Sequence, residues 1–67
     1  MDSFTEFRRL WNEAKAHRLG RVSTVSILTK NGSYLADDFQ ALMAEIYLFN
    51  SGKITARILL KDIVEVG

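Results

Sequence analysis

The sequence has no cysteine and no proline, and only four of its 67 residues are glycine. Without cysteine, neither a disulfide nor a thiolate metal site can stabilise the chain. The four glycines are scattered along the chain, so no glycine-rich loop of the kind that holds phosphates is present. No apolar run approaches the roughly 20 residues of a membrane span, and the charged start at Asp2 is unlike a signal peptide. These absences favour a small cytoplasmic domain that does not interact with a membrane.

Residues that carry catalysis or bind metal ions are also scarce. The single histidine, His17, lies among basic residues of an expected helix, and no serine has a histidine at a spacing that suggests a nucleophile. Asp37 and Asp38 are adjacent in an expected strand, so their side chains point to opposite faces and do not form a metal site. We therefore expect no enzyme, no catalytic residue, no metal and no cofactor.

The chain is rich in apolar residues for its size. At 67 residues it forms one domain, residues 1–67, and 48% of its residues are hydrophobic. A domain this small buries only about 60% of the surface of its unfolded chain. Self-association would supply the missing burial. The net charge is +1, with five basic and three acidic residues in 1–22 against four and five in 23–67, so only the N-terminal part is weakly basic.

The N-terminal segment predicts a helix over about residues 3–19. Ser3 followed by Glu6 is a capping-box pattern, and Gly20 suits the position just after a helix end. An apolar stripe at helical spacing is formed by Phe4, Phe7, Trp11 and Ala14. We expect this stripe to pack over an open end of the β structure, with docking to a membrane or a partner as the alternative.

The remaining residues predict five closely spaced strands, over about 21–30, 33–43, 45–50, 53–60 and 63–66. Asn31-Gly32 and Ser51-Gly52 are turn signals, and Asn-Gly favours a type I′ turn with positive φ at both residues. The offset of three between the apolar residues Phe39 and Leu42 predicts a bulge or bend near Gln40-Ala41. A second helix over 36–48 is the alternative. The expected fold is therefore mostly β, a helix followed by a strongly bent five-stranded antiparallel SH3-like barrel.

The segment Val25-Ser26-Ile27 followed by Asn31-Gly32 resembles the first strand and turn of the Sm-like family, specifically its bacterial host-factor (Hfq) branch. The first motif of that family continues with apolar residues at spacings matched by Leu35, Phe39, Leu42 and Ile46. The segment from Leu59 to Val66 is similar to the second motif. The resemblance covers nearly the whole chain and implies an Sm-type barrel.

The resemblance further implies a homo-oligomeric ring of five to seven subunits that binds single-stranded RNA around its pore and rim. Tyr47, for stacking on a base, and Lys61, for phosphate, occupy pore-lining positions, and Arg18 and Arg21 lie near the place of the rim arginines. The alternative is that Tyr47 is a half-buried strand residue and Lys61 a solvated loop residue. The chain departs from the family at the bend, where Asp37 replaces glycine. In the pore loop it carries Met43, Glu45 and Tyr47.

The last two expected strands carry apolar residues with little protection by charge or proline. Pairing of the fourth strand of one subunit with the fifth of the next would bury them, which is how the resemblance implies that the ring is built. The expected oligomer interface consists of Ile58, Leu59, Leu60, Ile63 and Val64. The same edges would suit another protein, so the competing interpretation is a small-barrel assembly or protein-interaction module that does not bind RNA.

Overall fold

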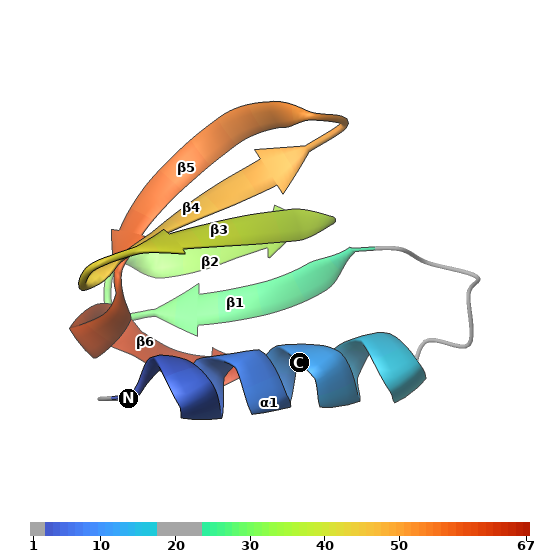
Figure 1. The fold of residues 1–67 in the computed structure, drawn as a ribbon, viewed down its shortest axis with the longest axis horizontal. Helices are drawn as coiled ribbons and strands as arrows, with labels where there is room; N and C mark the ends of the chain where they lie inside the picture. Colours follow the sequence, from blue (N-terminus) through green and yellow to red (C-terminus); the bar gives the residue numbers. More distant parts are fainter. Residues whose placement is uncertain (1–2, 18–23) are drawn as a thin grey trace.

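The computed structural model describes residues 3–17 and 24–67, and over these residues the chain forms an α-helix followed by six β-strands (Figure 1). The elements in chain order are α1 (Phe4–His17), β1 (Val25–Thr29), β2 (Gly32–Ala36), β3 (Asp38–Leu42), β4 (Glu45–Asn50), β5 (Lys53–Leu59), the short 3₁₀ helix η1 (Leu60–Asp62) and β6 (Ile63–Val66). The prediction of a mostly β chain with an N-terminal helix is confirmed. Residues 18–23, where the helix was expected to end and the first strand to begin, lie outside the described residues.

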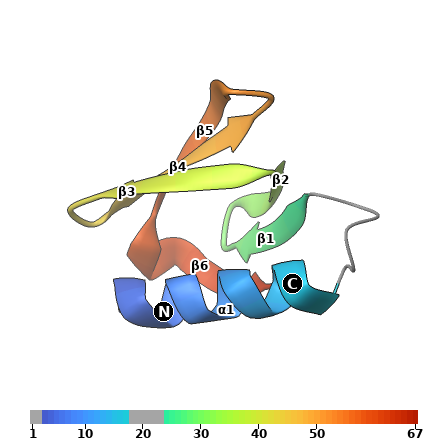
Figure 2. The ribbon, with the colours of Figure 1, turned by 45° about the vertical axis from the view of Figure 1, so that its right-hand side comes forward.

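The six strands form two antiparallel sheets of three, in the orders β2-β1-β6 and β3-β4-β5. Figure 2 shows the two sheets diverging above α1, with β6 and β1 next to the helix. The expected closed barrel of five strands is wrong for the single chain, because both sheets are open within the described residues. The chain leaves β5 through η1 and enters the other sheet as β6, so β5 and β6 are not paired with each other.

The expected long strand over residues 33–43 is broken at Asp37, where the chain passes from one sheet to the other. The predicted bend near Gln40-Ala41 is wrong, because the register of β3 against β4 is regular there. That prediction assumed that Phe39 and Leu42 both face the core. In the structure Leu42 is exposed and Ala41 joins Phe39 on the inner face, so the period of two is maintained. The alternative of a helix over 36–48 is likewise wrong.

The bend is held by hydrogen bonds of Asp37 to the end of β4 and to the turn that follows it. The Asp37 N–H donates to the carbonyl oxygen of Phe49 at 2.9 Å, and Asp37 Oδ2 accepts from the Ser51 N–H at 2.9 Å. The helix contributes as well, since Lys15 Nζ donates to the Asp37 carbonyl oxygen at 3.1 Å. An aspartate can thus occupy the bend because both its backbone and its side chain are satisfied there.

The turn at Ser51-Gly52 is confirmed in position and conformation, whereas the turn expected at Asn31-Gly32 lies one residue earlier, at Lys30-Asn31. Ser51 and Gly52 have φ of 55° and 80°, the positive values that a type I′ turn requires. In the first hairpin Thr29 pairs with Gly32, so the central residues of the turn are Lys30 and Asn31, and neither has a positive φ. Gly32 follows the turn with φ 136°, a value that side chains rarely adopt.

The core lies between the two sheets and is closed by the apolar face of α1. Phe7, Trp11 and Ala14 are buried, as the stripe predicted, and the Ser3 hydroxyl accepts from the Glu6 N–H at 3.4 Å, as in a capping box. The fully buried strand residues Val25, Ile27, Ala36, Ile46 and Leu48 come from both sheets. The helix is joined to the second sheet by aromatic contacts of the half-buried Phe39 in β3.

Candidate nucleic-acid interface

The β1–β2 turn, the β3–β4 turn and η1 meet at one end of the molecule, near the start of α1 (Figure 1). The Lys30 N–H donates to the Asp62 carbonyl oxygen at 3.1 Å, which joins the β1–β2 turn to η1. The Leu60 N–H donates to the Ala44 carbonyl oxygen at 2.9 Å, which joins η1 to the β3–β4 turn. Side chains of these turns would therefore act together on a ligand at this end.

Lys61 lies in η1, one of the elements that meet at this end, and its side chain is exposed. The neighbouring cation Lys30 is compensated, because its Nζ lies 3.1 Å from Asp62 Oδ1. The Asp62 carboxylate is largely buried, and its Oδ1 accepts no hydrogen bond within the described residues. The ion pair with Lys30 therefore supplies the compensating charge for this carboxylate. Lys61 forms no ion pair within 3–17 and 24–67, and it is therefore the uncompensated positive charge of these turns.

Tyr47 lies in the middle of β4, on the outer face of its sheet, opposite Gln40 of β3 and Arg57 of β5. It is half-buried and lines a cavity of about 200 Å³ together with Gln40, Leu42 and Ile54. No hydrogen bond, ion pair or ring contact joins Tyr47 to Lys61 in the described part of the chain. The predicted stacking residue and the predicted phosphate ligand thus come from different elements, β4 and η1.

Arg57 is a residue of this surface that the sequence analysis did not single out. Its Nε lies 3.1 Å from Glu45 Oε2, so the carboxylate at a pore-loop position is paired with a cation on the neighbouring strand. The pair is partly exposed and contributes little to stability, but it compensates the negative charge. Finding this pair requires the register of β4 against β5, in which Tyr47 lies opposite Arg57, and no motif in the sequence indicates that register.

The five residues of the expected oligomer interface divide into two groups. Ile58, Leu60 and Ile63 are buried in the core of the single chain. Leu59 in β5 and Val64 in β6 are 38% and 63% exposed, so their side chains are the ones that a neighbouring chain can contact. Within the described residues, β5 is paired only with β4 and β6 only with β1, which leaves one unpaired edge on each. The predicted rim residues Arg18 and Arg21 lie outside the described residues.

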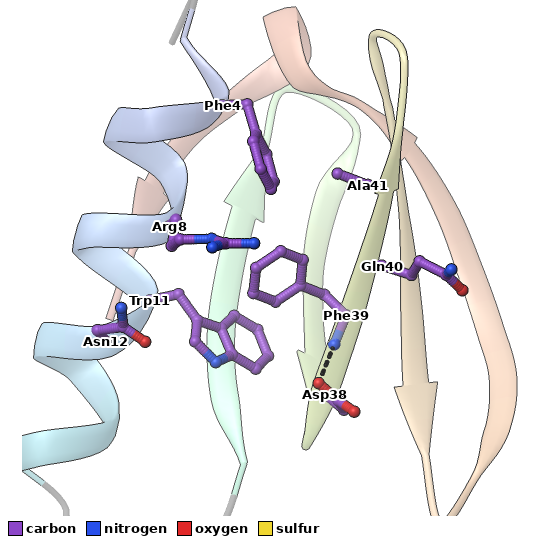
Figure 3. Close-up of a pocket in the computed structure, with 8 residues that line it drawn as sticks. All are labelled: Phe4, Arg8, Trp11, Asn12, Asp38, Phe39, Gln40 and Ala41. Carbon is purple, nitrogen blue, oxygen red and sulfur yellow. Dashed lines mark hydrogen bonds between the residues drawn. The ribbon is translucent and has the colours of Figure 1, made fainter.

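A second surface, not expected from the sequence, is a cleft of about 520 Å³ between α1 and β3 (Figure 3). Aromatic rings from both elements and polar side chains at its mouth line the cleft, namely Phe4, Arg8, Trp11, Asn12, Asp38, Phe39, Gln40 and Ala41. Helical periodicity places Arg8 beside the apolar stripe, but the sequence has no signal for which strand lies next to the helix. The cleft could therefore not be predicted from the sequence.

Comparisons of the chain with models of protein families, with curated proteins and with solved structures found no match. No helix among the described residues is both long and apolar enough to cross a membrane. In the same part of the chain, no cluster of three or more histidine, aspartate and glutamate side chains is arranged to hold a metal ion.

Proposed function

We propose that this chain is an Sm-like protein whose copies form a homo-oligomeric ring of five to seven subunits and bind single-stranded RNA in the cytoplasm. The two open sheets, with a sharp bend at Asp37 between them, would be the two halves of an Sm-type barrel. The observation that carries the proposal is that β5 and β6 are joined by η1 and that, over residues 3–17 and 24–67, each has one unpaired edge.

Pairing of β5 of one copy with β6 of the next would satisfy both edges. Unpaired strand edges expose backbone N–H and C=O groups and readily pair with another chain. Because the contact joins two different strands, β5 and β6, it is heterologous. Such a contact generates a closed ring when the rotation between neighbouring copies is a whole fraction of a full turn. Leu59 and Val64, which lie on these strands with exposed side chains, would become buried in such a contact.

RNA binding is supported by the position of Lys61. A ring repeats this uncompensated cation once in every subunit, so single charges of modest effect combine into a positive surface around the pore. Tyr47, Arg18 and Arg21 are the further proposed RNA-binding residues, with Tyr47 stacking on a base. Binding through several phosphate contacts would weaken steeply as the salt concentration rises.

A second candidate is an assembly or protein-interaction module that does not bind RNA. It is favoured by Met43, which is 93% exposed at the tip of the β3–β4 turn, beside the exposed Leu42. Exposed apolar residues at the end where RNA would bind are more typical of a protein contact than of a phosphate contact.

The solution mass, measured by light scattering behind a sizing column, tests the ring. Five to seven copies of a 7.6 kDa chain have a mass of about 38–53 kDa. Val64→Lys and Leu59→Lys are expected to reduce this mass to that of a monomer. Leu35→Lys is the matched control, since Leu35 is as exposed as Val64 but lies in β2. A monomeric wild-type protein, or a ring that tolerates both substitutions, would contradict the proposed assembly.

RNA binding is tested by fluorescence anisotropy of a labelled oligouridine between about 50 and 200 mM salt. The double variant Lys61→Ala/Arg18→Ala is expected to weaken binding at least about threefold. Lys53→Ala/Arg9→Ala removes the same charge elsewhere and is expected to have little effect. Equal binding by all three proteins would mean that the assigned residues are wrong, and no binding by the wild type would favour the second candidate.

A further inference from the structure

Within the described residues, strand β3 is paired only with β4, so its other edge is unpaired. Beside it, the side chains of Phe39 and of Phe4 and Trp11 on α1 point toward one another (Figure 3). The Phe39 N–H donates to Asp38 Oδ1 at 2.8 Å rather than to β4. In an antiparallel ladder, alternate residues direct their backbone groups to the same side, so Phe39 and Ala41 present N–H and C=O groups to the unpaired side. These groups form a short template to which a further strand can be added.

The cleft of about 520 Å³ lies beside this edge, within the size range of about 300–1,000 Å³ of ligand pockets. Its apolar part is formed by three rings, those of Phe4 and Trp11 on α1 and that of Phe39 on β3. The ring centroid of Phe39 lies 6.1 Å from that of Phe4 and 4.8 Å from that of Trp11. A side chain directed from an added strand toward α1 would reach these rings. The cleft therefore offers backbone pairing and an apolar surface at the same place.

The cleft is lined by one cation, Arg8, and one carboxylate, Asp38, with no ion pair between them. The Arg8 guanidinium lies 5.1 Å from the ring centroid of Phe4, and no carboxylate in the described residues pairs with it. The neighbouring Arg9 differs, because its guanidinium lies 3.1 Å from Glu13 and 3.8 Å from Glu6. A cation that rests on an aromatic ring without an anion is suited to bind a carboxylate of a partner.

We propose that the edge of β3 and the adjacent cleft bind an extended peptide segment of another protein. The peptide adds a strand to β3, with an apolar side chain against Phe4 and Phe39 and an acidic side chain on Arg8. The two side chains lie two positions apart, because strand residues that face the same side alternate with residues that face the other. The surface is separate from the edges of β5 and β6, and the inference does not depend on ring formation or RNA.

Asp38 would regulate access to this edge. Its carboxylate accepts the hydrogen bond of the Phe39 N–H, and that donor would be needed to pair with an added strand. Its negative charge would also repel an acidic peptide. Removing this side chain should therefore tighten binding. Removing Arg8 should weaken it, so substitutions on the two sides of the cleft are expected to act in opposite directions.

The probe is the capped peptide Thr-Val-Thr-Glu-Thr-Val-Thr, which places valine and glutamate on one face of a strand. Trp11 is the single tryptophan and lines the cleft, so its fluorescence reports binding by a peptide without aromatic residues. We expect saturable binding that weakens at least about threefold in Arg8→Ala, and when glutamine replaces the glutamate of the peptide. Asp38→Ala should bind about twofold tighter, and Arg9→Ala should bind as the wild type does.

Amide shifts in NMR spectra of the labelled protein locate the site. Shifts at Phe39 and Ala41 on peptide addition are expected, with little change in β5 and β6. The inference is wrong if the wild type shows no saturable binding, if the shifts map to β5 and β6, or if Arg9→Ala weakens binding as much as Arg8→Ala. Shifts of the same residues by oligouridine but not by the peptide would assign the cleft to nucleic acid and also overturn it.

Discussion

Replacement of Phe39 by leucine should destabilise the protein strongly although Phe39 is only half-buried. Its ring meets Phe7 and Trp11 with centroids 4.9 and 4.8 Å apart and Phe4 at 6.1 Å, each in an edge-to-face arrangement. These contacts connect α1 to the sheet formed by β3, β4 and β5. Leucine keeps much of the apolar surface but none of the ring contacts.

The magnitude follows from these three contacts. An aromatic pair contributes about 0.5–1.5 kcal/mol beyond its buried area, and leucine recovers part of the packing, so we expect a loss of about 2–3 kcal/mol. A chain of 67 residues has a total stability of about 3–10 kcal/mol. The substitution would thus remove a large fraction of the stability and lower the Tm by about 8–24 °C.

The free energy of unfolding is measured by urea titration, followed by circular dichroism and Trp11 fluorescence at equal protein concentration. Phe49→Leu is the matched control. Phe49 is also a half-buried phenylalanine of the same sheet, paired with Asp38 on the adjacent strand, but it lies on the outer face. We expect the control to lose less than about 1 kcal/mol. Equal losses in the two variants would refute the argument that the ring contacts hold the helix to this sheet.

Three further substitutions test local features by the same urea titration. Asp37→Ala should cost about 1–2 kcal/mol because the Ser51 N–H loses a charged acceptor, and an unchanged stability would contradict this role. Asn50→Ala should cost about 1 kcal/mol, since its amide donates to the Leu35 carbonyl oxygen at 2.8 Å and thereby joins the two sheets; a neutral effect would mean that this bond is not needed. Met43→Gly should gain about 1 kcal/mol because Met43 has φ 58°, and a loss would show that its exposed side chain stabilises the fold.

The helix and the turn at Ser51-Gly52 could be predicted because their signals are local. A stripe at helical spacing requires only neighbouring residues, and Phe7 and Trp11 are buried as the stripe indicated. Two-residue turns are likewise determined by the residues within them, which is why the turn at Ser51-Gly52 was located correctly. Elements of this kind do not depend on the rest of the fold.

Features that depend on contacts between distant segments could not be predicted. The bend at Asp37 is satisfied by Phe49, Ser51 and the helix, and none of these is adjacent to it in the sequence. The apolar run Ile58-Leu59-Leu60 hides an alternation, since only Leu59 is exposed, and hydrophobicity alone does not distinguish core from surface in such a run. The cleft beside Arg8 depends on which strand lies next to α1, and that is decided by tertiary packing.

The bend at Asp37 also has a consequence for how the chain folds. The hairpins β1–β2, β3–β4 and β4–β5 join residues close in sequence, and hairpins of this kind form in about 1–10 μs. The pairing of Ile27 with Val66 instead closes a loop that contains most of the chain, and such non-local pairing forms slowly. The residues on either side of Asp37 belong to different sheets, so the two sheets are covalently linked at the bend and cannot separate during folding. We therefore expect a single kinetic phase in which the bend, the helix and β6 dock together.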